Sequence, residues 1–289
     1  MTRAMPGLPE PPTVGSRMLP AGSYDGVTVL VTGGGTGLGK AIAAEFGRLG
    51  AGVAVASRDA DHRVAGVTAV EAAGGRAVAV DLDVREPESV AAAFDAAGSA
   101  LGPVTVLVNN AAANFPVAAA DLSPNGWRAV ERTVLDGTFF CSQELHRRAT
   151  GDGGAIVNIA TTAAMTGGPG MAHSAAAKAG VVALTKTLAV EWAVDGVRVN
   201  AIAPGLFPHE DLPDAIKAAR DDSLDASRQP AGRVGQPHEL GWAATWLCSP
   251  YASFVTGQVL VVDGGNWLRR DFAMPPVVPI RDQIPGRPR

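Results

Sequence analysis

The chain alternates short apolar runs with segments whose apolar residues recur at helical spacing. The runs are rich in Val, Ala and Ile, which is typical of strands buried on both faces of a parallel sheet. The pattern predicts strands at Val27–Val31, Gly52–Ser57, Arg76–Asp81, Val104–Val108, Ala155–Ile159, Val197–Ile202 and Gln258–Val262. It predicts helices at Lys40–Leu49, Asp61–Ala73, Pro87–Leu101, Asn125–Arg148, Ser174–Val194 and Pro237–Cys248.

This alternation predicts an α/β fold: a doubly wound (Rossmann-type) parallel seven-stranded sheet with helices on both faces. At 289 residues, of which 47% are hydrophobic, the chain can bury one large core. We expect a single domain over residues 23–268, because the composition does not change within it. A Pro-rich disordered arm at residues 1–22 would precede the domain, and a Pro/Arg-rich tail at residues 269–289 would follow it.

Charge and cysteine usage argue against several classes of function. The net charge of −4 provides no basic surface for nucleic acid. The two cysteines, Cys141 and Cys248, are far apart in sequence and predict neither a disulfide framework nor a metal site. The N-terminus has no continuous apolar segment of the kind found in secretion signals, and no apolar stretch approaches the roughly 20 residues that span a bilayer. We therefore expect a cytoplasmic protein with no membrane partner.

A glycine-rich turn follows the first predicted strand and precedes the first predicted helix. It runs Thr32-Gly33-Gly34-Gly35-Thr36-Gly37-Leu38-Gly39. Glycine permits a tight turn and a close approach of the backbone to a phosphate, and the free N–H groups at the start of the helix attract the same anion. Strand, turn and helix in this order predict the pyrophosphate site of a dinucleotide, with the cofactor at Gly33, Thr36, Gly37 and Leu38.

The residues after the second predicted strand, Ser57-Arg58-Asp59, bear on which nicotinamide cofactor is bound. An acid here accepts hydrogen bonds from the ribose 2′-hydroxyl of NAD, whereas a guanidinium pairs with the 2′-phosphate of NADP. Arg58 directly follows the strand and favours NADP(H). The alternative is a solvated Arg58, with Asp59 as the ribose ligand.

Six motifs in order resemble those of the short-chain dehydrogenase/reductase family, over about residues 20–268. They are Thr32-Gly33 with Gly37 and Gly39, Asp83-Val84, Asn109-Asn110-Ala111, Lys178, Pro204-Gly205 and Asp263-Gly264-Gly265. The resemblance implies that Asp83 and Val84 contact the adenine, although Asp83 taken alone could be an ordinary turn residue. It also implies that the rest of the cofactor site is lined by Asn110, Ala111, Lys178, Pro204, Gly205 and Leu206.

The catalytic motif departs from the family pattern. Most family members carry Ser, Tyr and Lys; the Tyr protonates a substrate carbonyl, and the Lys lowers the pKa of the Tyr. Here these positions hold Thr161, Ser174 and Lys178, and the only tyrosines, Tyr24 and Tyr251, are distant in sequence. Because a serine hydroxyl is far too weak an acid to replace the tyrosine, interconversion of ketones and alcohols is disfavoured.

One branch of the family, the 2,4-dienoyl-CoA reductases, works without the Tyr-x-x-x-Lys motif. The chain resembles this branch at Gly33–Lys40, Ala56–Arg58, Asn109–Ala112, Asn114-Phe115, Leu135–Thr138 and Ser174–Gly180. The resemblance implies NADPH-dependent reduction of a 2,4-dienoyl-CoA to a 3-enoyl-CoA. Charge then develops on a delocalised dienolate, which needs hydrogen-bond donors more than a strong acid. The chain departs from the branch at Ala163, where the mitochondrial type has tyrosine, and at Ala113, where the branch has glycine.

The expected catalytic residues are Thr161, Ser174, Lys178 and Asp136. Thr161 and Ser174 would hydrogen-bond the thioester, and Lys178 would hold the ribose and stabilise the dienolate. Asp136 would position a water or donate a proton, unless it is a surface or subunit-interface acid. Donation near pH 7 would require a pKa raised by burial.

The expected substrate-binding residues are spread over three segments. The loop at Asn114-Phe115 would line a substrate pocket, and Thr162 follows the fifth predicted strand. His173 is either an alternative proton source or a structural histidine. Phe207 begins a segment, extending to Arg233, that is either a mobile lid over the acyl group or a plain surface excursion.

The sequence therefore predicts an NADPH-dependent oxidoreductase of fatty acid metabolism that reduces a conjugated acyl thioester, with 2,4-dienoyl-CoA as the preferred substrate. Two alternatives stay open: a reductase of another conjugated or secondary-metabolite substrate, and a nucleotide-binding pseudoenzyme subunit. The last predicted strand, Gln258–Val262, resembles an edge strand that often pairs across a subunit interface in this family. We therefore expect a homo-oligomer, with a tetramer favoured.

Overall fold

The computed structural model describes residues 8–149, 153–211, 226 and 228–269. Within these residues seven strands form one parallel sheet, in the order β3-β2-β1-β4-β5-β6-β7. The strands are β1 Thr28–Thr32, β2 Gly52–Ser57, β3 Arg76–Asp81, β4 Val104–Asn109, β5 Gly154–Ile159, β6 Val197–Pro204 and β7 Val259–Val262. The predicted α/β fold with a seven-stranded parallel sheet is confirmed.

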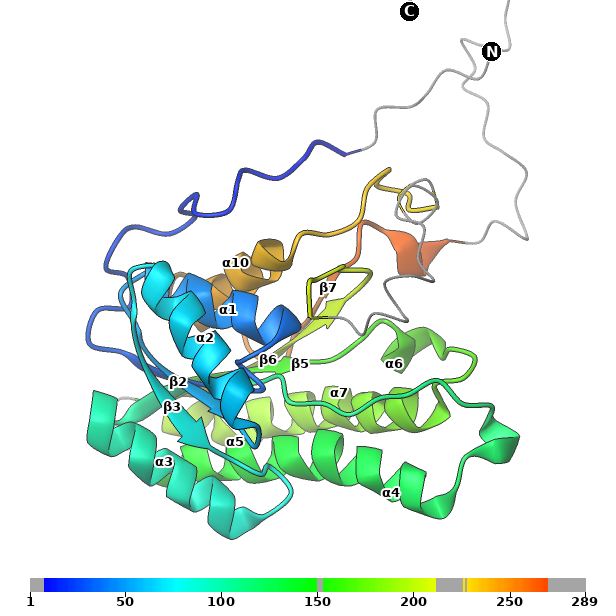
Figure 1. Cartoon of the computed structure of the whole chain (residues 1–289), viewed down its shortest axis with the longest axis horizontal. Helices are drawn as coiled ribbons and strands as arrows, with labels where there is room; N and C mark the ends of the chain where they lie inside the picture. The colour runs from blue at the N-terminus through cyan, green and yellow to red at the C-terminus, as the bar shows by residue number, and fades with distance from the viewer. Residues whose placement is uncertain (1–7, 150–152, 212–225, 227, 270–289) are drawn as a thin grey trace, which may run out of the picture.

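Helices cover both faces of the sheet (Figure 1). One face carries α1 Gly37–Arg48, α2 Ala60–Ala72 and α10 Pro237–Cys248, and the other carries α3 Pro87–Leu101, α5 Gly137–Arg148 and α7 Ala172–Trp192. Side chains of β1 pack alternately into the core on each face of the sheet. Val29 and Val31 pack with the first set of helices, and Leu30 packs with the second. This burial on two sides explains why the strand is apolar along its length.

The predicted helix at Asn125–Arg148 is divided into three parts. Helix α4 Pro124–Glu131 leads into a π-helical turn, η2 Arg132–Asp136, and then into α5. Val130 and Val134 pack here against residues of α7. A π-helical turn is wider than an α-helical one, is rare, and frequently occurs at functional sites. The apolar pattern of the sequence gives no sign of it.

The remaining elements are short. They are α6 Ala163–Thr166 and the 3-10 turns η1 Ala119–Asp121, η3 Ala193–Asp195, η4 Pro250–Ala252 and η5 Asn266–Leu268. None of the described helices is long and apolar enough to cross a membrane. In the same part of the chain no three His, Cys, Asp or Glu side chains gather at a metal-binding distance, and the two cysteines are buried free thiols.

The N-terminal arm, for which the sequence predicted disorder over residues 1–22, has fixed partners from residue 8 onward. The Leu8 N–H donates to the carbonyl of Ala231 at 2.7 Å, and the Trp242 indole donates to the carbonyl of Ser16 at 3.2 Å. The Leu19 side chain is buried in the core. From residue 8 to residue 22 the arm contains no helix or strand, and it lies along α10 (Figure 1). Residues 1–7, the tail beyond residue 269, and most of the predicted lid lie outside the described residues.

Candidate nucleotide and active site

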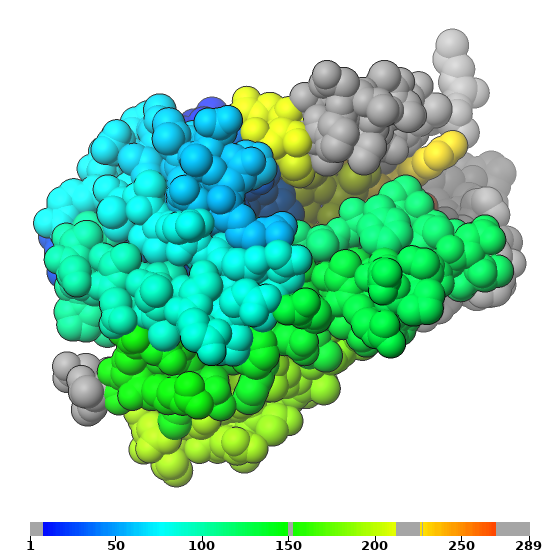
Figure 2. Space-filling view, turned by 60° about the horizontal axis from the view of Figure 1, so that its bottom comes forward, coloured from blue at the N-terminus to red at the C-terminus, as the bar shows by residue number. Residues whose placement is uncertain are grey.

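A groove opens at the carboxyl ends of the strands, where the strand order reverses between β1 and β4. Its volume is about 460 Å³, and Figure 2 shows it as a hollow between the blue-to-cyan and the green parts of the chain. Ten of the predicted cofactor residues line it: Gly33, Thr36, Gly37, Leu38, Arg58, Asp83, Val84, Asn110, Ala111 and Lys178. Residues from five separate segments of the chain thus meet where the sequence predicted a dinucleotide.

The glycine-rich turn brings the backbone at the start of α1 to the groove. Gly33 and Gly37 have φ angles of +63° and +51°, which other residues rarely adopt. A Cβ atom on Gly39 would overlap the carbonyl oxygen of Gly33. Glycine is therefore required here both by backbone conformation and by space. The resulting cradle of backbone N–H groups fits a phosphate.

Asn110 and Thr32 fasten the glycine-rich turn to the end of β4. Asn110 Nδ2 donates to the carbonyl oxygens of Thr32 and Gly33, both at 3.1 Å. Thr32 Oγ1 accepts the N–H groups of Asn110 and Ala111 at 3.0 and 2.9 Å. Asn110 lines the groove, but its amide nitrogen is engaged by the backbone. In this structure it positions the turn.

Charged side chains gather at the end of the groove beside β2 and β3. Arg58 is 59% exposed and lies 3.9 Å from the carboxylate of Asp83. Arg85 donates to the same carboxylate, at 2.9 Å from Nε and 2.5 Å from Nη2. These hydrogen bonds are the main reason that the pKa of Asp83 is lowered to about 2. Asp59 has a different role: its carboxylate caps α2 by accepting the His62 N–H at 3.0 Å.

Lys178 lines the groove on the β5 side and is 6% exposed. Its ammonium donates to the carbonyl oxygen of Ile159, at the end of β5. Burial lowers the pKa of Lys178 to about 8. Neither tyrosine lines the groove: Tyr24 is buried in the core, and Tyr251 is 67% exposed. The amine is therefore protonated at neutral pH without a phenol beside it.

Ser174 and His173 precede Lys178 on α7 and are buried. The Ser174 N–H donates to Nδ1 of His173 at 2.8 Å, so the neutral imidazole carries its proton on Nε2. Nε2 itself has no hydrogen-bond partner among the described residues. The imidazole also meets the Phe115 ring edge to face, with the ring centroids 4.5 Å apart. This contact brings the predicted substrate loop against α7.

Several of the predicted catalytic and substrate-binding residues do not line the groove: Asn114, Phe115, Asp136, Thr161, Thr162, His173 and Ser174. Thr161 Oγ1 accepts the Ala163 N–H at 3.4 Å, and Thr162 immediately precedes α6. Asn114 Nδ2 lies 3.4 Å from the sulfur of Met171. Asp136 ends the π-helical turn and is half-buried, while Thr133 of the same turn lines the groove.

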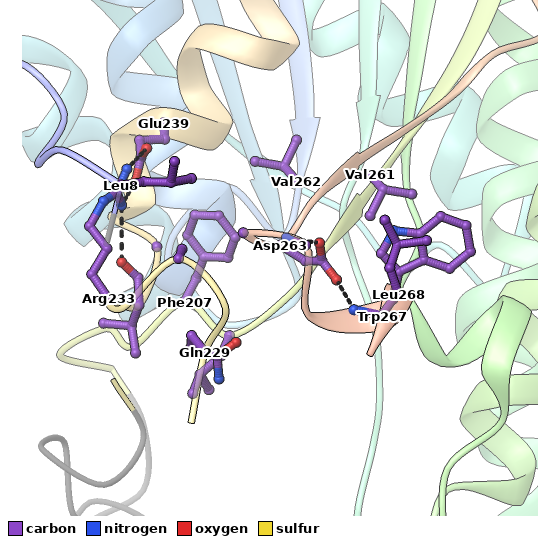
Figure 3. Close-up of a pocket in the computed structure, with 16 residues that line it drawn as sticks. Leu8, Phe207, Gln229, Arg233, Glu239, Val261, Val262, Asp263, Trp267 and Leu268 are labelled. Atoms are coloured by element: carbon purple, nitrogen blue, oxygen red, sulfur yellow. Dashed lines mark hydrogen bonds and ion pairs between the residues drawn. The ribbon is translucent and has the colours of Figure 1, made fainter. Parts of the chain in front are cut away.

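A second cavity, of about 390 Å³, lies beyond the ends of β6 and β7 (Figure 3). Leu206 and Phe207 line it, whereas Pro204 and Gly205 line neither cavity. Apolar side chains such as Val262 and Trp267 form much of its wall, and Arg233 is paired with Glu239 at 2.9 Å. The structure therefore does not bring Leu206 and Phe207 into the groove with the other predicted residues.

Sequence analysis missed nine residues that line the groove: Ala56, Ser57, His62, Leu82, Ala112, Thr133, Ile159, Ala160 and His209. Six of the nine lie one or two residues from a predicted residue at a strand end, and that closeness would have found them. His62 has a weaker signal, because it enters the groove through the capping of α2 by Asp59. His209 has none, since it arrives by a fold-back of the segment after β6.

Comparison with known proteins agrees with this geometry. Residues 33–266 match the family described as enoyl-(acyl carrier protein) reductase. A Bacillus subtilis protein named probable 2,4-dienoyl-CoA reductase, (2E)-enoyl-CoA-producing, is 41% identical over 246 residues, covering 83% of this chain and 96% of that protein. The mouse peroxisomal 2,4-dienoyl-CoA reductase, (3E)-enoyl-CoA-producing, is 38% identical over 241 residues, covering 82% of each.

Among solved structures, a short-chain dehydrogenase from Bacillus anthracis superposes with a TM-score of 0.77 at 39% identity, covering 85% of this chain and 98% of that one. The sequence relatives and the solved structure thus each cover more than four fifths of this chain. The chain belongs to the short-chain dehydrogenase/reductase family, in the group described as enoyl-(acyl carrier protein) reductases.

Proposed function

We propose that the protein is an NADPH-dependent reductase of a conjugated acyl thioester, with a 2,4-dienoyl-CoA as the preferred substrate. The observation that carries this proposal is Lys178, a buried amine of lowered pKa with a serine, Ser174, four residues before it. Such a site holds a positive charge and lacks the tyrosine that protonates a carbonyl. It suits a reaction in which charge spreads over a conjugated thioester rather than one that needs immediate protonation of an alkoxide.

The family implies a nicotinamide cofactor, and the choice of NADP(H) is supported by how Arg58 and Asp59 divide their roles. The Asp59 carboxylate is engaged by the first turn of α2, whereas Arg58 is exposed and lines the groove. A guanidinium in this place can pair with the three oxygens of a 2′-phosphate. NADP(H), when bound, supplies the hydride.

The chain's own residues would then stabilise the negative charge that develops on the substrate and direct the proton that is added to it. The Lys178 ammonium stabilises the negative charge that develops on the substrate, as well as holding the ribose. Ser174 and Thr161 donate hydrogen bonds to the thioester oxygen and orient it. Asp136 acts through a water, a role suited to its position on a turn of which Thr133, and not Asp136, lines the groove.

The wall of the acyl site is proposed to consist of Asn114, Phe115, Thr162 and His173, and Phe207 is proposed to bind substrate separately, from the second cavity. The ring contact between Phe115 and His173 supports this, since it ties the loop after β4 to the helix that carries Lys178. The position of Phe207 at an apolar cavity supports an environment for hydrocarbon (Figure 3).

The decisive experiment follows NADPH absorbance with purified protein and 2,4-hexadienoyl-CoA or a longer dienoyl-CoA. Controls are NADH in place of NADPH, and crotonyl-CoA, which has a single conjugated double bond. Oxidation of NADPH that depends on the dienoyl substrate supports the proposal. Because the two relatives compared above are named for different products, the product should be identified by mass spectrometry and NMR.

A negative result separates the other hypotheses. NADPH binding with turnover of a different conjugated substrate favours a reductase of secondary metabolites on the same scaffold. NADPH binding without turnover, together with co-purification of a tyrosine-bearing homologue, favours a pseudoenzyme subunit. Failure to bind either nicotinamide cofactor contradicts all three.

Assembly and location belong to the same proposal. The edge strand β7 pairs with β6 on one side, and its residues are only partly buried, which supports a homo-oligomer, with a tetramer favoured. Light scattering of the purified protein tests this. A cytoplasmic location is also proposed, and since the mouse relative is named peroxisomal, fractionation of cells is the appropriate measurement.

A further inference from the structure

Two acidic residues reach the start of α1 from the segment that follows β6. The N–H of Gly37 donates to Oδ2 of Asp211 at 2.6 Å. Lys40 Nζ, one turn into the helix, lies 3.0 Å from Oδ2 of Asp211 and 2.8 Å from Oε1 of Glu210. The Asp211 side chain is 24% exposed, whereas that of Glu210 is 80% exposed. Asp211 is therefore the residue that enters the structure, and Glu210 stays in solvent.

The contact satisfies a need of the helix that local sequence leaves unmet. The first turn of α1 contains no acidic residue, and Thr36 at the N-cap position makes no side-chain capping hydrogen bond. Free N–H groups and the dipole of a helix attract negative charge at this end. Asp211, which is 174 residues distant in sequence, supplies that charge.

His209, two residues before Asp211, also lies beside the glycine-rich turn. It lines the groove, and a Cβ atom on Gly37 would lie 2.9 Å from its Cε1 atom. Burial acts to raise the pKa of Asp211, but the Gly37 N–H and the Lys40 ammonium outweigh it and hold the pKa below its usual range. The group at the glycine-rich turn is therefore an ionised carboxylate, which offers the same charge-assisted hydrogen bonding as a phosphate oxygen.

We propose that residues 209–211, which we call the acidic strap, occupy the pyrophosphate subsite of the groove until NADP(H) displaces them. Lys40 is the exchange partner, since it pairs with the Asp211 carboxylate in the free protein and with the cofactor phosphates in the complex. This inference rests on the proposed nucleotide-binding function and adds a device that regulates it. The strap lowers the affinity for cofactor, and cofactor binding requires residues 209–211 to move away from the glycine-rich turn.

The energetic consequence is a reduced apparent affinity. If a ligand binds only those molecules in which the strap is displaced, its apparent dissociation constant is the intrinsic constant divided by the fraction of such molecules. If the strap occupies the subsite in about four molecules of five, its removal tightens NADPH binding by about fivefold.

The test compares Asp211→Asn with Glu210→Gln, using the full chain and two probes. NADPH carries a pyrophosphate, whereas adenosine 2′-phosphate carries only the 2′-phosphate. Isothermal titration calorimetry should show that Asp211→Asn tightens NADPH by about fivefold and leaves adenosine 2′-phosphate unchanged. Glu210→Gln removes an equal charge from the neighbouring residue and should change NADPH affinity by less than about twofold, because exposed ion pairs contribute little. Lys40→Met should weaken NADPH and spare adenosine 2′-phosphate.

Each contrary outcome has a distinct meaning. Weaker NADPH binding by Asp211→Asn would show that the strap closes over the cofactor and helps to hold it, which overturns the proposal. If Asp211→Asn and Glu210→Gln tighten NADPH binding equally, the effect is general charge repulsion, and this outcome also overturns the proposal. If the wild type binds neither NADPH nor adenosine 2′-phosphate, the proposed function itself has failed.

Discussion

The two ends of the groove use polar side chains in opposite ways. At the β2–β3 end, Arg58 and Asp83 are partly exposed and paired with other charged groups of the chain. On the β5 side only Lys178 of the three buried α7 residues lines the groove, while Ser174 and His173 lie next to it in the helix. Lys178 hydrogen-bonds only a backbone carbonyl among the described residues. The first end can exchange its internal partners for a ligand. The second has little freedom to do so.

This difference separates binding from chemistry. Breaking an exposed ion pair requires little free energy, so the charged side chains at this end can exchange their partners for a nucleotide easily. A buried amine has a lowered pKa because its charged form is desolvated. The low dielectric constant of the same environment strengthens its attraction for a developing negative charge. We therefore expect substitutions at the charged end to change affinity and substitutions on the β5 side to change turnover.

The largest effect is expected from Lys178→Met. Methionine keeps the length of the side chain but removes the charge, so dienoyl-dependent oxidation of NADPH should fall about a thousandfold. Because burial disfavours the charged amine in the folded state, the midpoint temperature of unfolding should stay the same or rise by about 2–4 °C. Lys186→Met, at an exposed position of the same helix, is the matched control and should alter neither quantity. An active Lys178→Met variant would remove the foundation of the proposed mechanism.

Arg58→Glu should act on cofactor choice. The substitution places a carboxylate where a 2′-phosphate would bind, so NADPH affinity should fall about fiftyfold relative to NADH. The matched control is Arg76→Glu, which makes the same charge change at the exposed amino end of β3. Fluorescence titrations with both cofactors give the ratio. Equal loss of NADPH and NADH would contradict a 2′-phosphate role for Arg58.

The pH profile tests the buried amine without a substitution. The pKa of Lys178 is lowered to about 8, so the amine is charged below that pH and loses its charge as the pH rises through it. The value of kcat/KM, which reports the free enzyme, should therefore decline above about pH 8 and fall by about tenfold near pH 9. Far-ultraviolet circular dichroism over the same range controls for unfolding. A flat profile up to pH 10 would show that the charge on Lys178 is not needed.

The parts of the fold and the site that the sequence predicted are those governed by local pattern. The strands are continuous apolar runs, and the predicted Val27–Val31 differs from β1 by a single residue at each end. The glycine-rich turn and Arg58 follow directly from strand ends, where the topology of a parallel sheet gathers functional residues.

The parts that the sequence did not predict depend on contacts between distant segments. The π-helical turn at Arg132–Asp136 interrupts a segment with an uninterrupted helical pattern. The N-terminal arm is fixed by the indole of Trp242, more than 200 residues away, and no local signal marks that contact. Asp211 meets Gly37 in the same way, because a hydrogen bond across 174 residues leaves no trace in either local sequence.

The smallest effects should come from Ser174 and Asp136, and their order distinguishes two ways of handling the proton. Ser174→Ala removes a buried hydroxyl on the helix of Lys178 and should lower kcat/KM about tenfold, in line with the loss of one hydrogen bond to a charged group. Asp136→Asn keeps a polar group that can hold a water, so the loss should be only about threefold. Steady-state kinetics at saturating NADPH measure both, with thermal unfolding as the control for folding. The reverse order, a large loss for Asp136→Asn beside a neutral Ser174→Ala, would show that Asp136 supplies the proton itself. The π-helical turn, and not the helix of Lys178, would then carry the acid of the reaction.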